Sequence, residues 1–476
     1  MNTPKMPEAV ADTLQADFNR LKAASGTTPF PSLAQRQAWL DALTRLIRDN
    51  MPALIEAVSR DFGHRSAVET RLAEIFPSLE GIRHARRHLK SWMRPRRRRV
   101  SFWFQPARAR LLAQPLGVVG IVVPWNYPLF LAFGPLLAAL AAGNRVMIKM
   151  SEYTPATGAL LQTLCGRYLG DDLVRVANGD AELAAAFTRL PFDHLLFTGS
   201  TEVGRHVMRA AADNLTPVTL ELGGKSPAWV TRSAHIRQAA EAIVAGKMLN
   251  AGQTCVAPDY VLVNEKDCAA LLEAIREAAR RAYPTLADNP DYSAIINARH
   301  YQRLSQWLEA ARQAGARIEA INPAGEALEA GRKFPLTLVQ DCPEDATLMR
   351  EEIFGPILPI VTYDTFEQAL AYINARPRPL ALYLFCNDPL RIDQALEGTI
   401  SGGVTINDTL LHVVQDDLPF GGVGPSGMGH YHAREGFMTF SKLKPVLHQS
   451  RLSGSRLTRA PYGRLVERLL SFMLKG

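Results

Sequence analysis

The apolar positions of the first ninety residues recur at the spacing of helices. Between residues 33 and 88, Leu40, Leu43 and Ile47 follow one another at three- and four-residue intervals, as do Leu54 and Val58. This spacing places apolar side chains on one face of a helix. We therefore predict a helical N-terminal region.

From residue 118 the pattern changes to short apolar runs that alternate with segments of helical pattern. The runs predict strands at 118–123, 146–149, 174–177, 194–197 and 218–222, and the segments between them predict helices at 129–142, 155–169, 181–188 and 201–212. Such alternation is typical of a parallel, doubly wound sheet, whose ligands bind at the carboxyl ends of the strands. A second α/β region is expected from about residue 223 to about residue 406. The predicted fold class is therefore α/β.

The composition indicates a globular protein with two or three domains. The chain has 476 residues, 47% apolar and 21% charged, which excludes a disordered chain. Its five cysteines form no CxxC pair, which argues against a disulfide framework or a zinc site and favours a reducing compartment. Residues 111–144 carry no charge, but four prolines interrupt them, so a strand, a turn and a buried helix are expected there rather than a membrane span. Because the N-terminus has no apolar signal segment, we expect a soluble, cytoplasmic protein. We also expect no bound metal.

One basic segment accounts for the net charge of +8. Residues 83–110 hold eleven Lys or Arg and no acidic residue, and without them the net charge would be −3. The cluster at 94–99 has the charge to bind nucleic acid or an anionic membrane. Val100, Phe102 and Phe104 alternate as in a strand, which favours an assembly arm instead. We expect no nucleic acid partner, and the basic tail 451–476 predicts an amphipathic helix that docks on protein rather than on membrane.

Two segments carry residues suited to covalent catalysis. In Asn250-Ala-Gly-Gln-Thr-Cys255 small residues surround a cysteine, which leaves room for a reacting carbonyl beside a nucleophilic thiolate. Glu221 ends an apolar strand and precedes two glycines, and burial would raise its pKa into the range of a general base. The alternatives are a buried structural cysteine and a strand-end glutamate whose hydrogen bonds are satisfied.

Three further segments lie at predicted strand ends, where ligands bind. Asn126 stands between two prolines, and its amide can donate to an oxyanion. Lys149 and Glu152 suit the hydroxyls of a nucleotide ribose, and the segment 197–204 opens a helix with the glycine and hydroxyls of a pyrophosphate site. The segment 422–427 matches GxGxxG but follows no convincing strand, so we interpret it as a glycine-rich loop, expected near the substrate.

Seven short motifs, six of which contain the segments described above, together resemble those of the aldehyde dehydrogenase superfamily. PWNYP, IKMSE, FTGSTEVG, LELGGKSP, GQTC, EEIFGP and LPFGGVGPSGMG occur in that family's order. SGGVTIND and GHYHAREGFMTFSK resemble its class 3 branch, and within it the bacterial coniferyl aldehyde dehydrogenases. Met150 departs from the family, which often has proline there. The resemblance implies two doubly wound α/β domains and a small β arm for oligomerisation.

The resemblance also implies roles for individual residues. Cys255 matches the nucleophile, Glu221 the general base and Asn126 the oxyanion donor. Residues that match cofactor contacts are Lys149 and Glu152 for the adenosine ribose, Gly199 and Ser200 for the phosphates, Val203 for adenine, and Glu352 and Phe354 for the nicotinamide side. The implied domains are 1–90 with 112–222 for NAD(P) binding, 223–410 for catalysis, 91–111 with 411–450 for the arm and glycine-rich loop, and 451–476 for the basic tail.

The expected reaction is oxidation of an aldehyde to its carboxylic acid through a thiohemiacetal and a thioester on the cysteine. NAD is the expected cofactor, because Glu152 would repel the 2′-phosphate of NADP, although NADP is accepted in this branch. Tyr127, Tyr431 and Phe437 suit a flat phenylpropenal such as coniferyl aldehyde, with long-chain or general aliphatic aldehydes as the alternative. The CoA-acylating class is disfavoured because it has little use for Glu221, and the remaining alternative is a binder of anionic polymers or membranes. A homodimer is expected.

Overall fold

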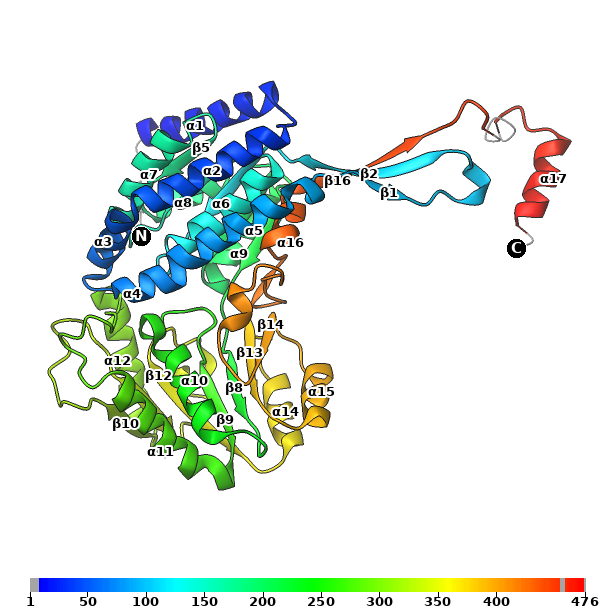
Figure 1. Ribbon diagram of the computed structural model, residues 1–476. Coiled ribbons are helices and arrows are strands. Elements are labelled where there is room, and N and C mark those ends of the chain that lie inside the picture. The colour runs from blue at the N-terminus through cyan, green and yellow to red at the C-terminus, as the bar shows by residue number, and fades with distance from the viewer. Residues whose placement is uncertain (1–7, 454–458, 475–476) are drawn as a thin grey trace.

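The computed structural model describes residues 8–453 and 459–474, which form two α/β units and a projecting arm (Figure 1). The first unit is built on a six-stranded sheet in the order β15-β7-β6-β3-β4-β5, parallel except where β15 meets β7. Its strands are β3 (Val118–Val122), β4 (Arg145–Lys149), β5 (Val174–Ala177), β6 (His194–Thr198), β7 (Val218–Glu221) and β15 (Gly427–Met428). The helices between the parallel strands are α6 (Phe130–Ala142), α7 (Pro155–Tyr168), α8 (Ala181–Thr188) and α9 (Thr201–Ala212).

Every predicted element of this sheet is present to within one residue at either end. The agreement is good because these strands are buried on both faces, as all five residues of β4 and of β6 are, and their central residues are therefore apolar. The uncharged stretch 111–144 forms most of β2, all of β3 and α6, as predicted, and no helix among the described residues is long and apolar enough to cross a membrane.

The N-terminal region is helical, as its periodicity predicts. It consists of α1 (Glu8–Thr27), α2 (Leu33–Asp49), α3 (Met51–Phe62), α4 (Ala67–Thr70), the π-helical turn η1 (Arg71–Ile75) and α5 (Phe76–Trp92). These helices pack over the first sheet, and α5 lies along α6. The charged residues on the buried side of α4 and η1 lie close to the carboxyl end of β3, which matters for the site below.

The second unit is a seven-stranded sheet in the order β10-β11-β12-β9-β8-β13-β14, parallel except for β10 with β11. Its strands are β8 (Pro227–Val230), β9 (Tyr260–Asn264), β10 (Arg317–Ile321), β11 (Leu336–Gln340), β12 (Ile357–Tyr363), β13 (Ala381–Phe385) and β14 (Gly403–Ile406). Its helices are α10 (Ile236–Met248), the turn η3 (Leu249–Gly252), α11 (Glu265–Ala282), α12 (Ala298–Gln313), α13 (Thr347–Arg350), α14 (Phe366–Asn374) and α15 (Pro389–Gly398). With two α/β units and a small β arm, the predicted fold class is confirmed.

The arm is a three-stranded antiparallel sheet in the order β1-β2-β16 that extends away from the body (Figure 1). It contains β1 (Arg96–Arg98), β2 (Arg108–Pro115) and β16 (Ser441–His448), which follows the turn η4 (Leu411–Val414) and the helix α16 (Ala433–Thr439). The amphipathic helix α17 (Arg464–Met473) lies at the far end, where the ring centroid of Phe472 is 6.1 Å from that of Trp103. The predicted tail helix is therefore present, and residues 454–458 and 475–476 of the tail lie outside the described residues.

The strand predicted over Val100, Phe102 and Phe104 is wrong. The pairing of Arg98 with Ala109 requires the chain to reverse between β1 and β2, and residues Phe102–Phe104 form the 3₁₀ turn η2 at the tip. All three aromatic side chains of this turn are exposed, with 82% of Phe102 accessible. The alternation in the sequence therefore reflects the exposed tip of a hairpin and not a strand.

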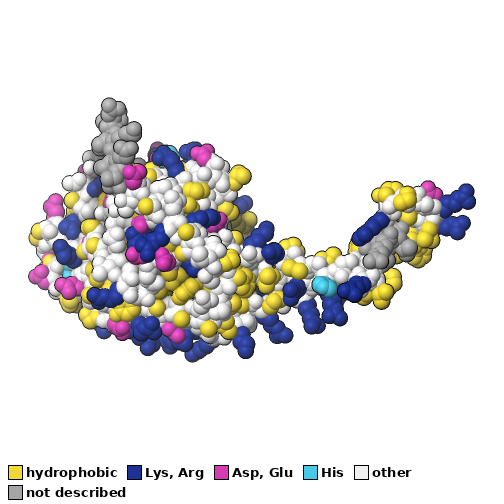
Figure 2. Space-filling model, turned by 90° about the horizontal axis from the view of Figure 1, so that it is seen from above, with side chains coloured by type: hydrophobic (Ala, Val, Ile, Leu, Met, Phe, Trp, Pro, Cys, Tyr) yellow, Lys and Arg dark blue, Asp and Glu magenta, His cyan; other side chains and the backbone are white. Residues whose placement is uncertain are grey.

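The positive charge of the protein is concentrated in this arm and the C-terminal tail. Residues 91–115 and 441–476 contain fifteen Lys or Arg and one acidic residue, which leaves 39 basic and 45 acidic residues in the rest of the chain. Figure 2 shows the basic side chains along the arm and hydrophobic side chains at its far end. The body of the protein is thus net acidic and the arm strongly basic.

Candidate active site

Cys255, Glu221 and Tyr127 line one cavity between the two α/β units. Its other walls are mostly apolar and include Leu131, Leu249, Leu380, Leu410 and Phe420. The polar groups at its surface are few, namely the hydroxyls of Tyr127, Thr198 and Thr254, the Glu221 carboxyl and the Cys255 thiol. We refer to this cavity as the chamber.

Glu221 is the last residue of β7 and is held in place by its backbone. Its neighbours in the sheet are Thr198 of β6 on one side and Gly427 of β15 on the other. The side chain is 1% exposed, and neither carboxyl oxygen has a hydrogen-bond partner among the described residues. Burial raises the pKa of Glu221 well above its usual value. The chamber therefore contains a carboxyl group that is more basic than an exposed glutamate.

Cys255 follows a sharply bent segment of backbone. Asn250, Ala251 and Gly252 adopt φ values of 53°, 51° and 72°, three successive residues in the left-handed region. At Gly252 a Cβ atom would lie 2.5 Å from the carbonyl oxygen of Gly355, so only glycine fits there. Burial raises the pKa of the Cys255 thiol to about 12, with Glu352 and Glu221 adding to the effect. This shift favours the thiol form, whereas the nucleophile expected from the sequence is the thiolate.

The loop of Asn126 is tied directly to the loop of the cysteine. The Asn126 side-chain amide donates to the carbonyl oxygen of Gln253 at 3.2 Å, and its own backbone carbonyl accepts from the side chain of Asn250 at 3.1 Å. Gln253 in turn donates to the carbonyl oxygens of Asn250 and Ala294. Asn126 and Cys255 therefore lie on two loops that are hydrogen-bonded to each other.

Three buried charged residues of the N-terminal helical region support these loops, and the sequence reasoning missed them. Arg65 and Glu74 form an ion pair at 3.0 Å with both side chains fully buried. Arg65 also donates to the backbone carbonyl of Asn126 at 2.8 Å, and its guanidinium lies 4.7 Å from the ring centroid of Tyr127. Glu69 accepts from the backbone N–H of Asn250 at 3.0 Å. The signal available in the sequence was a pair of acidic residues interrupting the apolar side of a helical stretch.

The residues assigned to the cofactor lie along the carboxyl ends of adjacent strands. Gly199 and Ser200 connect β6 to α9, and the Ser200 hydroxyl caps this helix by accepting from the backbone N–H of Val203 at 3.4 Å. Val203 is 47% exposed on the first turn. Lys149 ends β4 and donates to the carbonyl oxygens of Met150 and Gly179, and the exposed Glu152 follows it. The order β6-β3-β4 places these groups on one edge of the sheet.

The glycine-rich loop lies beside this edge. The hydroxyl of Thr201, the first residue of α9, donates to the carbonyl oxygen of Pro425 at 3.0 Å, and Leu222 donates to the carbonyl oxygen of Ser426. Residues 422–427 thus contact the start of α9 and the end of β7, and only the neighbouring Phe420 reaches the chamber wall.

Glu352 and Phe354 lie on the side of the second sheet. The Glu352 carboxyl occupies the space where a side chain on Gly223 would be, and burial raises its pKa to about 8, with Asp259 adding to the effect. Lys225 holds this segment through an ion pair with Asp259 and hydrogen bonds to the carbonyl oxygens of Leu348 and Glu351. The ring of Phe354 packs edge-on against Trp125 at 5.3 Å.

Phe437 is not part of the chamber, so its prediction as a substrate-pocket residue is wrong. It is fully buried in α16, where its ring packs on Trp92 at 5.7 Å, because α16 turns this face toward α5 and α6. Tyr431 is also buried and does not line the chamber, although burial and the charges of Glu221 and Cys255 raise the pKa of its phenol well above its usual value. Of the three predicted aromatic residues, the structure places only Tyr127 in the chamber wall.

The fold and this arrangement define an aldehyde dehydrogenase. The model of the aldehyde dehydrogenase family matches residues 4–446, and the chain belongs to that family of NAD(P)-dependent oxidoreductases. It is 55% identical to the "Probable coniferyl aldehyde dehydrogenase" of Pseudomonas aeruginosa over 96% of this chain and 95% of the relative. It is 47% identical to the "Coniferyl aldehyde dehydrogenase" of Pseudomonas sp. HR199 over 98% and 97% of the two chains. The substrate-bound state of Staphylococcus aureus AldH superposes with a TM-score of 0.91 at 38% identity, covering 97% of this chain and 99% of that one.

Proposed function

We propose that this enzyme oxidises an aromatic aldehyde, such as coniferyl aldehyde to ferulate, with Cys255 as the nucleophile and Glu221 as the general base. The observation that carries the proposal is the presence of both groups in one apolar chamber, with aromatic walls from Tyr127, Phe130 and Phe420. The names of the two Pseudomonas relatives support the choice of substrate.

In this mechanism the Cys255 sulfur, once deprotonated, attacks the carbonyl carbon. The Asn126 amide and the backbone N–H of Cys255 donate hydrogen bonds to the resulting oxyanion, and removing one such donor typically costs about 3–4 kcal/mol of transition-state stabilisation. When bound, NAD(P) supplies the hydride acceptor. The acyl group is then held as a thioester on Cys255. Glu221 takes a proton from the water that attacks the thioester, and the acid is released.

The residues at the edge of the first sheet fit a dinucleotide. The start of α9 offers backbone N–H groups to phosphates beside Gly199 and Ser200, and Val203 offers exposed apolar surface to a base. Lys149 and Glu152 suit the ribose hydroxyls. Because the Glu152 carboxylate would repel a 2′-phosphate, NAD is the preferred cofactor in this proposal and NADP a poorer one. The ratio of kcat/KM for the two cofactors, measured with one aldehyde, tests this preference.

Initial rates with NAD across coniferyl aldehyde, benzaldehyde, decanal and acetaldehyde test the substrate. The proposal expects the highest kcat/KM for coniferyl aldehyde. A higher value for decanal would overturn it in favour of an aliphatic substrate. Acid formation without CoA distinguishes this enzyme from an acylating one.

The same proposal includes a homodimer joined through the arm. The arm exposes Phe102, Trp103 and Phe104 at its tip and is basic where the body is acidic, and arginine beside aromatic residues is typical of subunit interfaces. Sedimentation of the full chain at micromolar concentration tests it, and a monomer would overturn it.

A further inference from the structure

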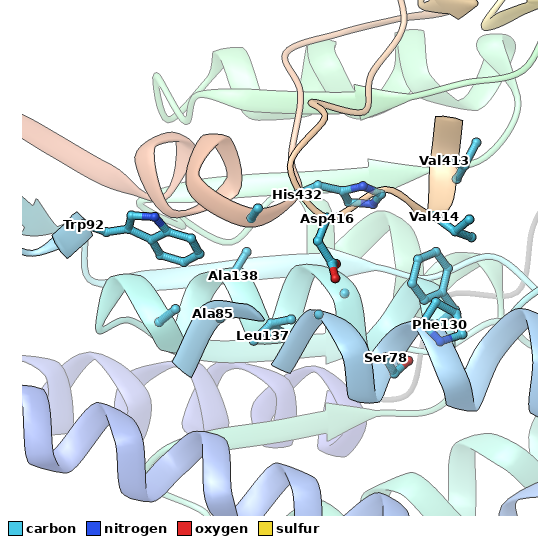
Figure 3. A pocket seen from close by; sticks show the side chains of 15 residues that line it. Ser78, Ala85, Trp92, Phe130, Leu137, Ala138, Val413, Val414, Asp416 and His432 are labelled. Atoms are coloured by element: carbon cyan, nitrogen blue, oxygen red, sulfur yellow. The ribbon is translucent and has the colours of Figure 1, made fainter. Parts of the chain in front are cut away.

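A second cavity adjoins the chamber. It lies between α5 and α6 on one side and the segments that precede and follow the glycine-rich loop on the other (Figure 3). Phe130, Val413 and Val414 line both spaces. These three side chains therefore form the boundary between the chamber and the second cavity.

The space is largely apolar, and its polar side chains are those of Ser78, Asp416 and His432. The Ser78 hydroxyl already donates to the carbonyl oxygen of Glu74. Figure 3 shows Trp92 at one end, Phe130 with Val413 and Val414 at the other, and His432 and Asp416 between them. His432 is half-buried, but its Nε2 atom is buried and has no hydrogen-bond partner in the described part of the chain. An unpaired buried polar group costs about 1–3 kcal/mol, so a histidine here needs a reason.

The backbone of His432 adds a second cost. Its φ and ψ are 136° and 147°, a conformation that is nearly confined to glycine and costs other residues about 1–3 kcal/mol. Paired backbone hydrogen bonds between Phe420 and Tyr431 hold the chain in place just before it. The imidazole also stacks on Phe420 with a centroid distance of 5.3 Å and lies edge-on to Phe130 at 6.1 Å. Both of these phenylalanines are chamber walls, so the imidazole lies directly behind the chamber.

The charge states limit what the cavity can bind. Burial lowers the pKa of His432 to about 4, with His412 adding to the effect, so the imidazole is neutral. Burial raises the pKa of Asp416 to about 6, with Glu80 raising it further and Arg83 opposing, so Asp416 is mainly a carboxylate above neutral pH. The carboxylate disfavours an anion, and both the carboxylate and the unprotonated nitrogen of a neutral imidazole accept hydrogen bonds from a neutral O–H group.

We propose that this second cavity is the distal part of the substrate site, where His432 and Asp416 bind the phenolic hydroxyl of an aromatic aldehyde. The inference rests on the proposed function and deepens it, because it restricts the substrate class to hydroxylated aryl aldehydes. The apolar boundary of Phe130, Val413 and Val414 accommodates the ring and chain, and the unpaired Nε2 gains the partner that the protein does not supply.

The test compares coniferyl aldehyde with its methyl ether, 3,4-dimethoxycinnamaldehyde, which lacks the O–H. We expect the wild type to favour coniferyl aldehyde by roughly tenfold in kcat/KM, the factor that one hydrogen bond of about 1.4 kcal/mol supplies. His432→Phe keeps the ring stacked on Phe420 and removes the nitrogen, and it should abolish most of this preference. Asp416→Asn, which keeps the shape and removes the charge, should reduce it. His430→Gln, at an exposed histidine of the same loop, should retain it.

The outcomes separate the two proposals. A wild type that oxidises both aldehydes with equal kcat/KM overturns the distal site and leaves the proposed function standing. Retention of the full preference by both folded variants, with folding checked by thermal unfolding, also overturns the distal site. A wild type that oxidises neither aldehyde but does oxidise decanal overturns the aromatic substrate itself.

Discussion

The buried ion pair of Arg65 and Glu74 supports the chamber, and its removal tests how the site is held. The substitution Arg65→Met deletes the cation and leaves the Glu74 carboxylate without it in a fully buried position. Removing one partner of a buried ion pair typically destabilises a protein by about 3–5 kcal/mol. The same change removes the 2.8 Å hydrogen bond to the Asn126 carbonyl, so Asn126, the proposed oxyanion donor, loses one of the contacts that orient its loop. Loss of activity by tenfold or more is expected, since small displacements of reacting groups can cost about a hundredfold.

The sign of the pH dependence follows from Glu74. Burial raises its pKa in the folded protein, and Arg65 opposes that shift, so the variant should have a still higher folded-state pKa. A carboxyl whose pKa is raised on folding favours the folded state while it is protonated, and stability is lost as the pH rises above its unfolded value. The variant should therefore lose more stability, relative to the wild type, at pH 8 than at pH 5.5.

Denaturant unfolding followed by tryptophan fluorescence at both pH values measures this prediction. The matched control is the double variant Arg65→Met, Glu74→Gln, in which neither charge of the pair remains and the amide oxygen can still accept from the backbone N–H groups of Leu129 and Phe130. It should be more stable at pH 8 than Arg65→Met alone. Equal stability of the single and double variants, or a loss that does not depend on pH, would refute the reasoning.

Three further predictions concern the chamber itself. Cys255→Ala should abolish aldehyde-dependent NADH formation, whereas Cys342→Ala, at a cysteine that does not line the chamber, should not. Any retained turnover in the first variant contradicts the assigned nucleophile. Glu221→Gln should slow steady-state turnover. Because burial raises the pKa of Glu221, the wild-type rate should rise with pH as this carboxyl ionises, and the variant should lack this rise. Identical pH profiles of the two proteins would remove Glu221 as the base. Gly252→Ala should destabilise the protein by about 1–3 kcal/mol and impair activity, since its Cβ would lie 2.5 Å from the Gly355 carbonyl oxygen at a φ of 72°. An unchanged midpoint in thermal unfolding would show that the bent backbone at this glycine is not rigid.

Much of the first sheet could be predicted from the sequence because its strands are buried on both faces. Apolar runs such as those of β4 and β6 have no other explanation in a globular chain, and their ends mark the edge where Glu221 and Lys149 lie. The arm tip could not be predicted, because alternating apolar residues have the same pattern in a strand and in an exposed turn such as η2. Phe437 shows the same ambiguity, since the sequence does not show which aromatic side chains face a cavity and which face a neighbouring helix.

The charged residues behind the chamber were missed for a different reason. Helical periodicity predicts which face of a helix is apolar, and it treats a glutamate as exposed. Glu69 and Glu74 are buried because their partners come from distant parts of the chain: the backbone of Asn250 for Glu69, and Arg65 and the start of α6 for Glu74. Pairings of this kind are set by the tertiary fold. The two acidic residues interrupt the apolar side of a helical stretch, but the local sequence does not show which distant groups pair with them.

The apolar burial of the chamber has two opposite consequences for catalysis. It raises the pKa of the Cys255 thiol to about 12 and that of Glu221 well above its usual value, so the two groups rest as a neutral thiol and a carboxyl that readily holds a proton. Ionisation of the thiol would place a negative charge on sulfur in a poorly solvated space and is therefore unfavourable until a substrate arrives. The same low polarity strengthens the hydrogen bonds that Asn126 and the Cys255 N–H can offer to an oxyanion. A chamber that disfavours the free thiolate thus favours the charged state that forms only when the sulfur has bonded to an aldehyde.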